Sequence, residues 1–283
     1  MTEQNKGKLN YLERTLPDGL LVDAAWMERH GYSTSLRSQY VSAGWLLQPA
    51  RGTYKRPRGE LTWEKTVISL QTLLERPLIV GGRTALELQG LAHYLAPQGP
   101  TVVHLHGREP PPGWLAKLPL EVRFVFHRSQ ALFRSEPVTK ALSDFAWNVD
   151  DNTGRHAAGL EAAAVRELSI GAEWPLAIST PERAFLELLD ELPGRETFHN
   201  VDVIAEGLRT LSPRRLQKLL EDCRSIKVRR LFFWFADRHG YRLLNQIDRD
   251  RVPLGSGKRV LAKNGKLDPK YLITVPDDLG APV

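Results

Sequence analysis

Through the first sixty residues, hydrophobic positions recur with the spacing of a helix, and each helical run is followed by a turn residue such as glycine or proline. The pattern predicts three helices, over residues 8–16, 23–30 and 34–43. Two short strands are predicted next, over residues 45–47 and 53–56, with a proline- and glycine-containing turn between them. Helices followed by a β-hairpin are the order of a winged helix-turn-helix. The helix that starts at Ser33 or Thr34 then takes the place of the recognition helix.

The rest of the chain mixes helical and strand patterns. Helices are predicted over residues 63–74, 84–94 and 228–239, and a further helix opens at Ser212-Pro213. Ser179-Thr180-Pro181-Glu182 predicts a capping box ahead of another helix. Strands are predicted over residues 78–80, 101–106 and 122–126. We therefore expect an α+β protein, with a winged helix-turn-helix over residues 1–60 and a larger mixed α/β domain over residues 61–283.

Composition narrows the class of protein without naming a function. The chain has 283 residues, of which 42% are hydrophobic and 25% charged, as in ordinary globular proteins. It contains no apolar run of the roughly 18–20 residues that a membrane span needs, and its first residues lack the apolar stretch of a secretory signal. The single cysteine, Cys223, excludes an internal disulfide and a cysteine-cluster metal site. These features predict a cytoplasmic protein.

Charge is distributed unevenly along the chain. The formal net charge is +6, and residues 29–58 contain six arginines or lysines and no acid. A carboxylate there would face phosphate groups if the predicted recognition helix entered the major groove. We therefore expect DNA contacts from the polar face of that helix and from the hairpin. The expected DNA-binding residues are Ser33, Thr34, Ser35, Arg37, Ser38, Gln39, Arg51, Lys55, Arg56 and Arg58.

Each of these side chains suits a nucleic-acid contact. Arginine can bind guanine with two hydrogen bonds and glutamine can do the same with adenine, while hydroxyl groups suit phosphates or either base. The alternative is a small helical packing unit whose exposed side happens to be basic, because helix-turn-helix shapes without DNA function exist.

A second basic cluster lies between Gly207 and Phe232, where eight arginines or lysines face two acids. Its candidates for an anion-binding face are Arg214, Arg215, Lys218, Lys227, Arg229 and Arg230. One alternative is a solvated helix face, which is the usual role of a charge run. The other is a second contact with the DNA backbone, with RNA or with an acidic protein.

Sites for metals, cofactors and catalysis are weakly signalled. His104 and His106 point to one face of a predicted strand, but no third metal ligand follows from their spacing, and we expect no metal. Residues 254–259 lack the glycine and hydroxyl positions of a phosphate loop, and we expect no cofactor. Gly81-Gly82 ahead of a helix could hold an anion or allow tight packing on a strand. No nucleophile–base set or nuclease signature emerges, so the chain is not expected to be an enzyme.

The order of these segments resembles the AbiEi family of antitoxins from type IV toxin–antitoxin systems. The stretches that carry the resemblance are SAGWLLQPARGTYKRP, GGRTALELQGLAHYL, STPERAFLELLDELP, SPRRLQKLLEDC and LGSGKRVLAKNGKLDPKYLITVP. The resemblance implies a winged helix that binds inverted repeats in duplex DNA and represses its own operon. It also implies a C-terminal domain that counteracts a nucleotidyltransferase-like toxin without forming a stable complex. The turn QPARG has one basic residue, which leaves open how deeply the wing enters a groove.

Two other function classes compete with this hypothesis. A nucleic-acid-modifying enzyme would gather acidic residues around a metal ion in the larger domain. A plain repressor with a sensing or oligomerising C-terminal domain would contain an apolar pocket there.

Overall fold

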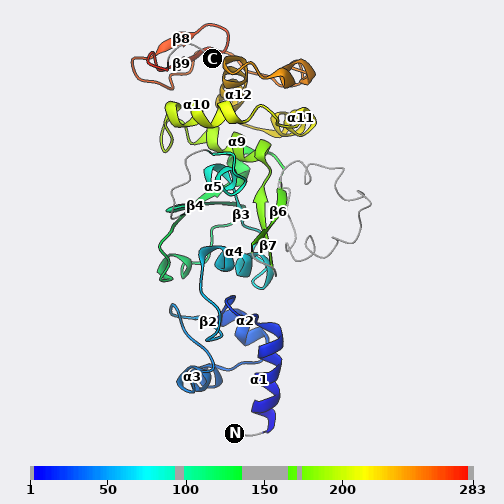
Figure 1. Ribbon diagram of the computed structural model, residues 1–283, viewed down its shortest axis with the longest axis vertical. Coiled ribbons are helices and arrows are strands. Elements are labelled where there is room, and N and C mark those ends of the chain that lie inside the picture. The colour runs from blue at the N-terminus through cyan, green and yellow to red at the C-terminus, as the bar shows by residue number, and fades with distance from the viewer. Residues whose placement is uncertain (1–2, 93–98, 136–164, 171–173, 280–283) are drawn as a thin grey trace.

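The computed structural model describes residues 3–92, 99–135, 165–170 and 174–279. The molecule is elongated, with the N-terminal helix α1 (Glu3–Thr15) at one end and the hairpin of β8 (Lys266–Asp268) and β9 (Ile273–Val275) at the other (Figure 1). Helices and strands are mixed throughout, which confirms the predicted α+β class. In the described part of the chain, no helix has the length and apolar character needed to cross a membrane.

The N-terminal unit has the element order of a winged helix-turn-helix. After α1 come β1 (Leu21–Asp23), α2 (Ala24–Arg29), α3 (Thr34–Ser42) and β2 (Thr53–Lys55). The Asp23 carboxylate accepts a hydrogen bond from the Trp26 amide at 2.8 Å, and the Ser33 hydroxyl accepts one from the Leu36 amide at 3.3 Å. Each cap satisfies a backbone donor that the first turn of a helix leaves without a partner, so these residues fix where α2 and α3 begin.

The predicted hairpin differs from the structure in its pairing. β2 pairs in antiparallel fashion with β1, in the register Val22 to Tyr54, and only Leu47 of the predicted strand 45–47 forms a bridge, to Lys55. The apolar run that contains Val22 was missed as a strand because it is only three residues long. Val22 and Tyr54 are both buried, so the paired strands form part of the core of the N-terminal unit. The wing is therefore a loop between Leu47 and β2, anchored on β1.

A five-stranded mixed sheet forms the middle of the molecule, in the order β5-β4-β3-β7-β6. Its strands are β3 (Ile79–Val80), β4 (Val102–Gly107), β5 (Arg123–Arg128), β6 (Val165–Ile170) and β7 (Trp174–Ser179). β4 and β5 are parallel, with His106 opposite His127, while β3 runs antiparallel to β4 and parallel to β7. The predicted strands near 78–80, 101–106 and 122–126 are thus confirmed as β3, β4 and β5.

Helix α4 (Trp63–Thr72) joins the N-terminal unit to the sheet. The Ser69 hydroxyl of α4 accepts a hydrogen bond from the Leu21 amide of β1 at 3.0 Å. On its other side, the buried amide of Gln71 donates to the carbonyls of Leu78 and Ala177 and accepts from the Ala177 amide. All these hydrogen bonds are buried. Helix α4 therefore connects the N-terminal unit to the sheet through a hydrogen-bonded contact rather than through a solvated linker. The division at residue 60 stays a prediction.

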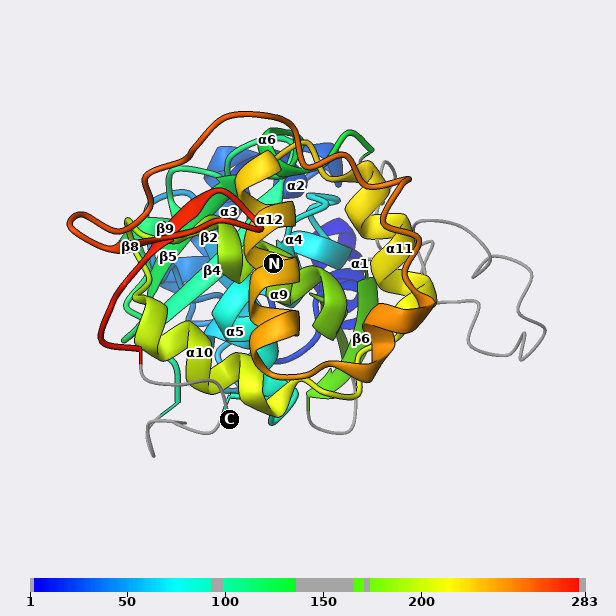
Figure 2. The same cartoon turned by 90° about the horizontal axis from the view of Figure 1, so that it is seen from above.

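The short helix α6 (Ser129–Leu132) directly follows β5. The other remaining α-helices lie on the side of the sheet away from the N-terminal unit (Figure 1). They are α5 (Gly82–Leu88), α9 (Pro181–Asp190), α10 (Phe198–Gly207), α11 (Pro213–Asp222) and α12 (Ile226–Arg238). Viewed along the long axis, α12 crosses over α9, and α10 and α11 lie on opposite sides of it (Figure 2). Phenylalanines of α9 and α12 pack edge to face, with the Phe185 and Phe232 rings 6.3 Å apart.

Helix caps in this layer follow the sequence with one change. Ser212 caps α11 as predicted, but α9 is capped by Thr180, whose hydroxyl accepts from the Arg183 amide, rather than by Ser179. Glu182 does not close a capping box. Its buried carboxylate instead accepts a hydrogen bond from the Ser212 amide at 2.7 Å and so ties the starts of α9 and α11 together.

A buried carboxylate holds α5, α9 and β4 together. Glu187 of α9 accepts hydrogen bonds from Arg183, one turn earlier, and from the Gly82 amide at the start of α5, and it lies 3.5 Å from the ring nitrogen Nδ1 of His106. The anion at this helix start therefore belongs to the protein itself. A Cβ atom at Gly81 would stand 2.3 Å from the Glu187 carboxylate and 2.5 Å from the His106 ring. Gly81 thus serves close packing, whereas Gly82 adopts a positive φ of 53° that favours glycine.

Gly81→Ala should therefore destabilise the protein by about 1–3 kcal/mol, the usual cost of overpacking a filled core. The backbone of Gly81 is extended (φ −137°), so the cost comes from the collision and not from the dihedral angle. Urea unfolding of the purified chain measures the difference. Gly113→Ala is the matched control, because a Cβ at Gly113 meets no atom within 4 Å. Equal stability of the two variants would contradict the close approach of Glu187.

Candidate nucleic-acid interface

The outer face of α3 is polar and free of acids. Five of the expected DNA-binding residues on this helix and its cap are exposed to solvent: Ser33, Thr34, Ser35, Ser38 and Gln39. The inner face carries Leu36 and Tyr40, which are buried against the rest of the unit, and the Tyr40 ring lies 5.6 Å from the Trp45 ring. This division leaves hydroxyl and amide groups directed outward along the helix, as base and phosphate contacts require.

Arg37 lies inside the unit, unlike its neighbours on α3. It is 6% exposed, and its guanidinium group donates to the Ala24 carbonyl at 2.7 Å and to the Thr34 hydroxyl at 2.8 Å. The same group lies 5.8 Å from the centre of the Tyr54 ring. These contacts join α2, α3 and β2. The expectation that Arg37 reaches a guanine conflicts with this placement, because its hydrogen-bonding groups face the protein interior.

Lys55 is also buried, and it too donates a hydrogen bond to a backbone carbonyl. It is 4% exposed and its Nζ donates to the Gly59 carbonyl at 2.9 Å. Burial lowers the pKa of this ammonium, since desolvation disfavours the charged form. Lys55 therefore holds the segment that follows β2 in place and is not available to a phosphate. The sequence pattern missed this because alternation along a three-residue strand does not show that both faces are covered.

The remaining basic residues of the window differ in accessibility. Arg51, at the tip of the wing, and Arg58, beyond β2, are exposed, and so is Arg29 at the end of α2. Arg56 is partly buried and forms an ion pair with Asp18 at 3.2 Å. Of the six arginines and lysines between residues 29 and 58, three are thus exposed. The basic character of this surface is about half of what the composition indicates.

The second basic cluster divides in the same way. Arg214 and Arg215 are exposed and Lys218 is partly exposed on the outer side of α11. Arg229 and Arg230 are 3% and 1% exposed and do not belong to a surface. Lys227 is partly buried, with its Nζ donating to the carbonyls of Asp190 and Leu192. The predicted six-residue face therefore consists of three residues on α11.

The buried arginines serve the loop that follows residue 252. Arg229 donates to the carbonyls of Pro253 and Cys223, and Arg230 donates to those of Leu254, Gly257 and Leu272. The glycine-rich segment near Gly257 thus turns carbonyl groups toward cations. A phosphate loop needs the reverse, with amide groups turned toward an anion.

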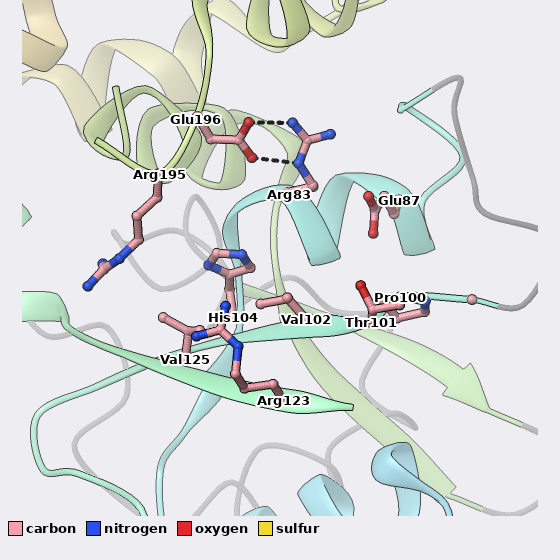
Figure 3. A pocket seen from close by; sticks show the side chains of 11 residues that line it. Arg83, Glu87, Pro100, Thr101, Val102, His104, Arg123, Val125, Arg195 and Glu196 are labelled. Atoms are coloured by element: carbon pink, nitrogen blue, oxygen red, sulfur yellow. Dashed lines mark hydrogen bonds and ion pairs between the residues drawn. The ribbon is translucent and has the colours of Figure 1, made fainter. Parts of the chain in front are cut away.

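A polar pocket lies on the sheet beside α5 and the start of α10. It encloses about 550 Å³ and is lined by polar and charged groups, among them Arg83, His104, Arg123, Arg195 and Glu196 (Figure 3). Arg83 binds the Glu196 carboxylate with two hydrogen bonds, which raises the pKa of the guanidinium further. A sensing pocket for an apolar ligand, as a plain repressor would need, differs from this lining.

His104, which lines this pocket, contacts a second histidine behind it. His104 lies on β4, and its Nδ1 is 2.9 Å from Nε2 of His127 on β5. The other ring nitrogen of His127 is 3.2 Å from the carboxylate of Glu191, at the end of α9. Sequence spacing identified only the histidines of β4. His127 could have been found from the parallel register of β4 and β5, whereas Glu191 depends on how α9 packs.

Comparison with known proteins assigns most of the chain to one protein family. The family profile described as "Transcriptional regulator, AbiEi antitoxin, Type IV TA system" matches residues 101–276, and "Transcriptional regulator, AbiEi antitoxin N-terminal domain" matches residues 5–97. No curated protein sequence matches the chain. The crystal structure of the RV2827C protein from Mycobacterium tuberculosis is similar at a TM-score of 0.51 and 18% identity, over 96% of this chain and 92% of that one. At this identity the likeness concerns the fold alone.

Arg37→Met should lower the free energy of unfolding by about 1–2 kcal/mol, because two buried hydrogen bonds from a charged group are lost while most of the packing volume is kept. Urea unfolding followed by tryptophan fluorescence measures this loss. Arg51→Met is the control, since an exposed arginine should change stability by less than about 0.5 kcal/mol. Equal behaviour of the two variants would mean that Arg37 does not hold α2, α3 and β2 together.

Proposed function

The chain belongs to the AbiEi antitoxin family of transcriptional regulators from type IV toxin–antitoxin systems, and on this premise we propose that it binds duplex DNA upstream of its own operon and represses it. The proposed DNA-binding domain comprises residues 1–60 and the proposed antitoxin domain residues 61–283. The observation that carries the DNA-binding proposal is the acid-free outer face of α3 beside a wing whose tip residue, Arg51, is exposed.

The recognition helix has the right chemistry for reading bases. An α-helix fits the major groove, which is about 12 Å wide, and residues near its N-terminus reach the base edges. Thr34, Ser35 and Ser38 supply hydroxyl groups for phosphates or bases, and Gln39 supplies an amide that pairs with adenine through two hydrogen bonds. In this proposal Arg37 positions the helix rather than contacting a base. Its ties to Ala24 and Tyr54 fix the angle between the helix and the wing.

Phosphate contacts fall to the exposed arginines. Arg51 and Arg58 flank β2, and Arg29 ends α2. Guanidinium groups bind phosphate oxygens with paired hydrogen bonds, so these residues suit backbone contacts that orient the helix in the groove. Arg56 is held by Asp18 and contributes less. The proposed operator contains inverted repeats, and a DNA-bound regulator of this kind acts in the cytoplasm.

The larger domain is proposed to counteract a nucleotidyltransferase-like toxin encoded in the same operon, without a stable complex between the two proteins. The experiment that tests both halves expresses the full chain with the toxin of the adjacent gene. A variant that carries Gln39→Ala and Arg51→Ala should lose repression of a promoter reporter and still restore growth. Parallel loss of both activities, in a variant that folds normally, would contradict the division of labour. Growth arrest with the unmodified chain would contradict the antitoxin role.

Gln39→Ala should weaken binding to the operator by about 1–3 kcal/mol, roughly 5- to 150-fold, and relax the sequence preference at one position, because the amide contact to a base is lost. Fluorescence anisotropy with the operator and with a scrambled duplex measures both effects. The matched control is Gln246→Ala, which removes an exposed glutamine far along the chain. An unchanged operator affinity in Gln39→Ala would show that α3 does not read bases as proposed.

The salt dependence of binding should reflect the exposed arginines only. Three phosphate contacts predict that log affinity falls with log salt concentration at a slope of about −2.7. Arg51→Ala should make this slope shallower by about 0.9 and weaken specific and non-specific duplexes alike. Arg214→Ala tests the face of α11 and should leave the slope unchanged. A shallower slope in Arg214→Ala would instead assign DNA contacts to α11.

A further inference from the structure

Two imidazoles and one carboxylate converge from three separate elements on one point of the larger domain. His104 comes from β4, His127 from β5 and Glu191 from the end of α9. One ligand atom from each residue lies within 4.8 Å of the other two. In the described part of the chain this is the group of histidine and acidic side chains placed to hold a metal ion. Sites that hold a side-chain ligand from each of three elements are rigid, because no single loop movement opens them.

The short contacts in this group run through both ring nitrogens of His127. His104 Nδ1 and His127 Nε2 are 2.9 Å apart, and His127 Nδ1 and the Glu191 carboxylate are 3.2 Å apart. Zinc bonds to nitrogen and oxygen measure about 2.0–2.2 Å, so two ligands of a tetrahedral ion stand roughly 3.4 Å apart. A single cation would bind only one nitrogen of His127, so the His127 side chain would move until that nitrogen faced both His104 and Glu191, whose ligand atoms lie within 4.8 Å of it.

A second layer of contacts fixes the rings, as is usual around metal ligands. The His106 ring stacks on His127 with centroids 4.6 Å apart, and His106 lies 3.5 Å from Glu187. Glu187 is in turn held by Arg183 and by the Gly82 amide. The orientation of His127 is thus determined by buried neighbours that do not themselves belong to the group of three.

We propose that His104, His127 and Glu191 bind one divalent cation of the zinc class, with a remaining coordination position toward the polar pocket that His104 lines. Two nitrogens and one carboxylate oxygen suit Zn²⁺ and similar transition metals, whereas Mg²⁺ and Ca²⁺ prefer oxygen ligands alone. The pocket of about 550 Å³ provides the entry path and room for a water or an anionic group on the ion. The site is independent of DNA binding, so its test stands apart from the proposed function.

The experiment uses the full chain, purified without a histidine tag, and ZnSO₄ as the probe. Calorimetric titration and metal analysis after dialysis should give one zinc ion per chain, and zinc should raise the midpoint of thermal unfolding. His127→Gln and Glu191→Gln should each weaken zinc binding more than the roughly 10–100-fold typical for loss of an outer contact. Co²⁺ in place of zinc should give the visible absorption of a low-symmetry site in the unmodified chain and not in His127→Gln.

His199→Gln is the matched control, because His199 is exposed and lies 3.6 Å from Asp278, outside the group. It should bind zinc like the unmodified chain. Circular dichroism and the thermal midpoint without metal establish that each variant is folded. The proposal is overturned if the unmodified chain takes up no zinc, which would leave the three side chains as a hydrogen-bonded chain alone. It is also overturned if zinc binding survives in folded His127→Gln and Glu191→Gln, or is lost in His199→Gln.

Discussion

Buried cationic side chains that donate to backbone carbonyls hold the parts of this protein together. Arg37 binds a carbonyl of α2, Lys55 binds one beyond β2, and Arg230 binds three carbonyls of the C-terminal segment. Ala24 is the first residue of α2, and the other carbonyls lie in segments outside the helices and strands. A buried charged donor that lost these acceptors would cost about 1–3 kcal/mol or more. Long arginine and lysine side chains reach such groups from a neighbouring helix or strand. The winged unit and the C-terminal layer thus depend on the same kind of interaction, a buried cation that donates to backbone carbonyls.

Because several basic side chains are buried, the surface is less basic than the sequence indicates. The acid-free window contains six cations, five of which were expected to contact DNA, but two of these five are buried in the protein interior and one is paired with Asp18. What remains is a polar helix face with arginines at its margin, which favours reading of bases with modest electrostatic attraction. The face of α11 is similarly reduced, because Arg229 and Arg230 point inward. A protein with this distribution should depend on specific contacts more than on general affinity for nucleic acid.

The sequence predicted local structure well wherever a helix cap or an apolar period was strong. The helices capped by Asp23, Ser33 and Ser212 begin where they were expected to, since the hydroxyl or carboxylate acts on the next turn of its own helix. Long-range partners could not be predicted: the pairing of β1 with β2 and the approach of Glu191 to His127 depend on packing between distant segments. Charge alone also cannot tell a buried arginine from an exposed one. The burial of Arg37 follows from the nearby Ala24 carbonyl, which the spacing of residues does not reveal.

We propose that α3 and the wing form the DNA-contacting surface of this regulator. Hydrogen–deuterium exchange of the full chain, with and without a duplex from upstream of its own gene, can test this, because amide protection reports contact along the whole sequence. The duplex should slow exchange in residues 33–42 and 51–59. Unchanged exchange in both segments, or protection confined to residues 213–222, would show that DNA does not bind to α3 and the wing.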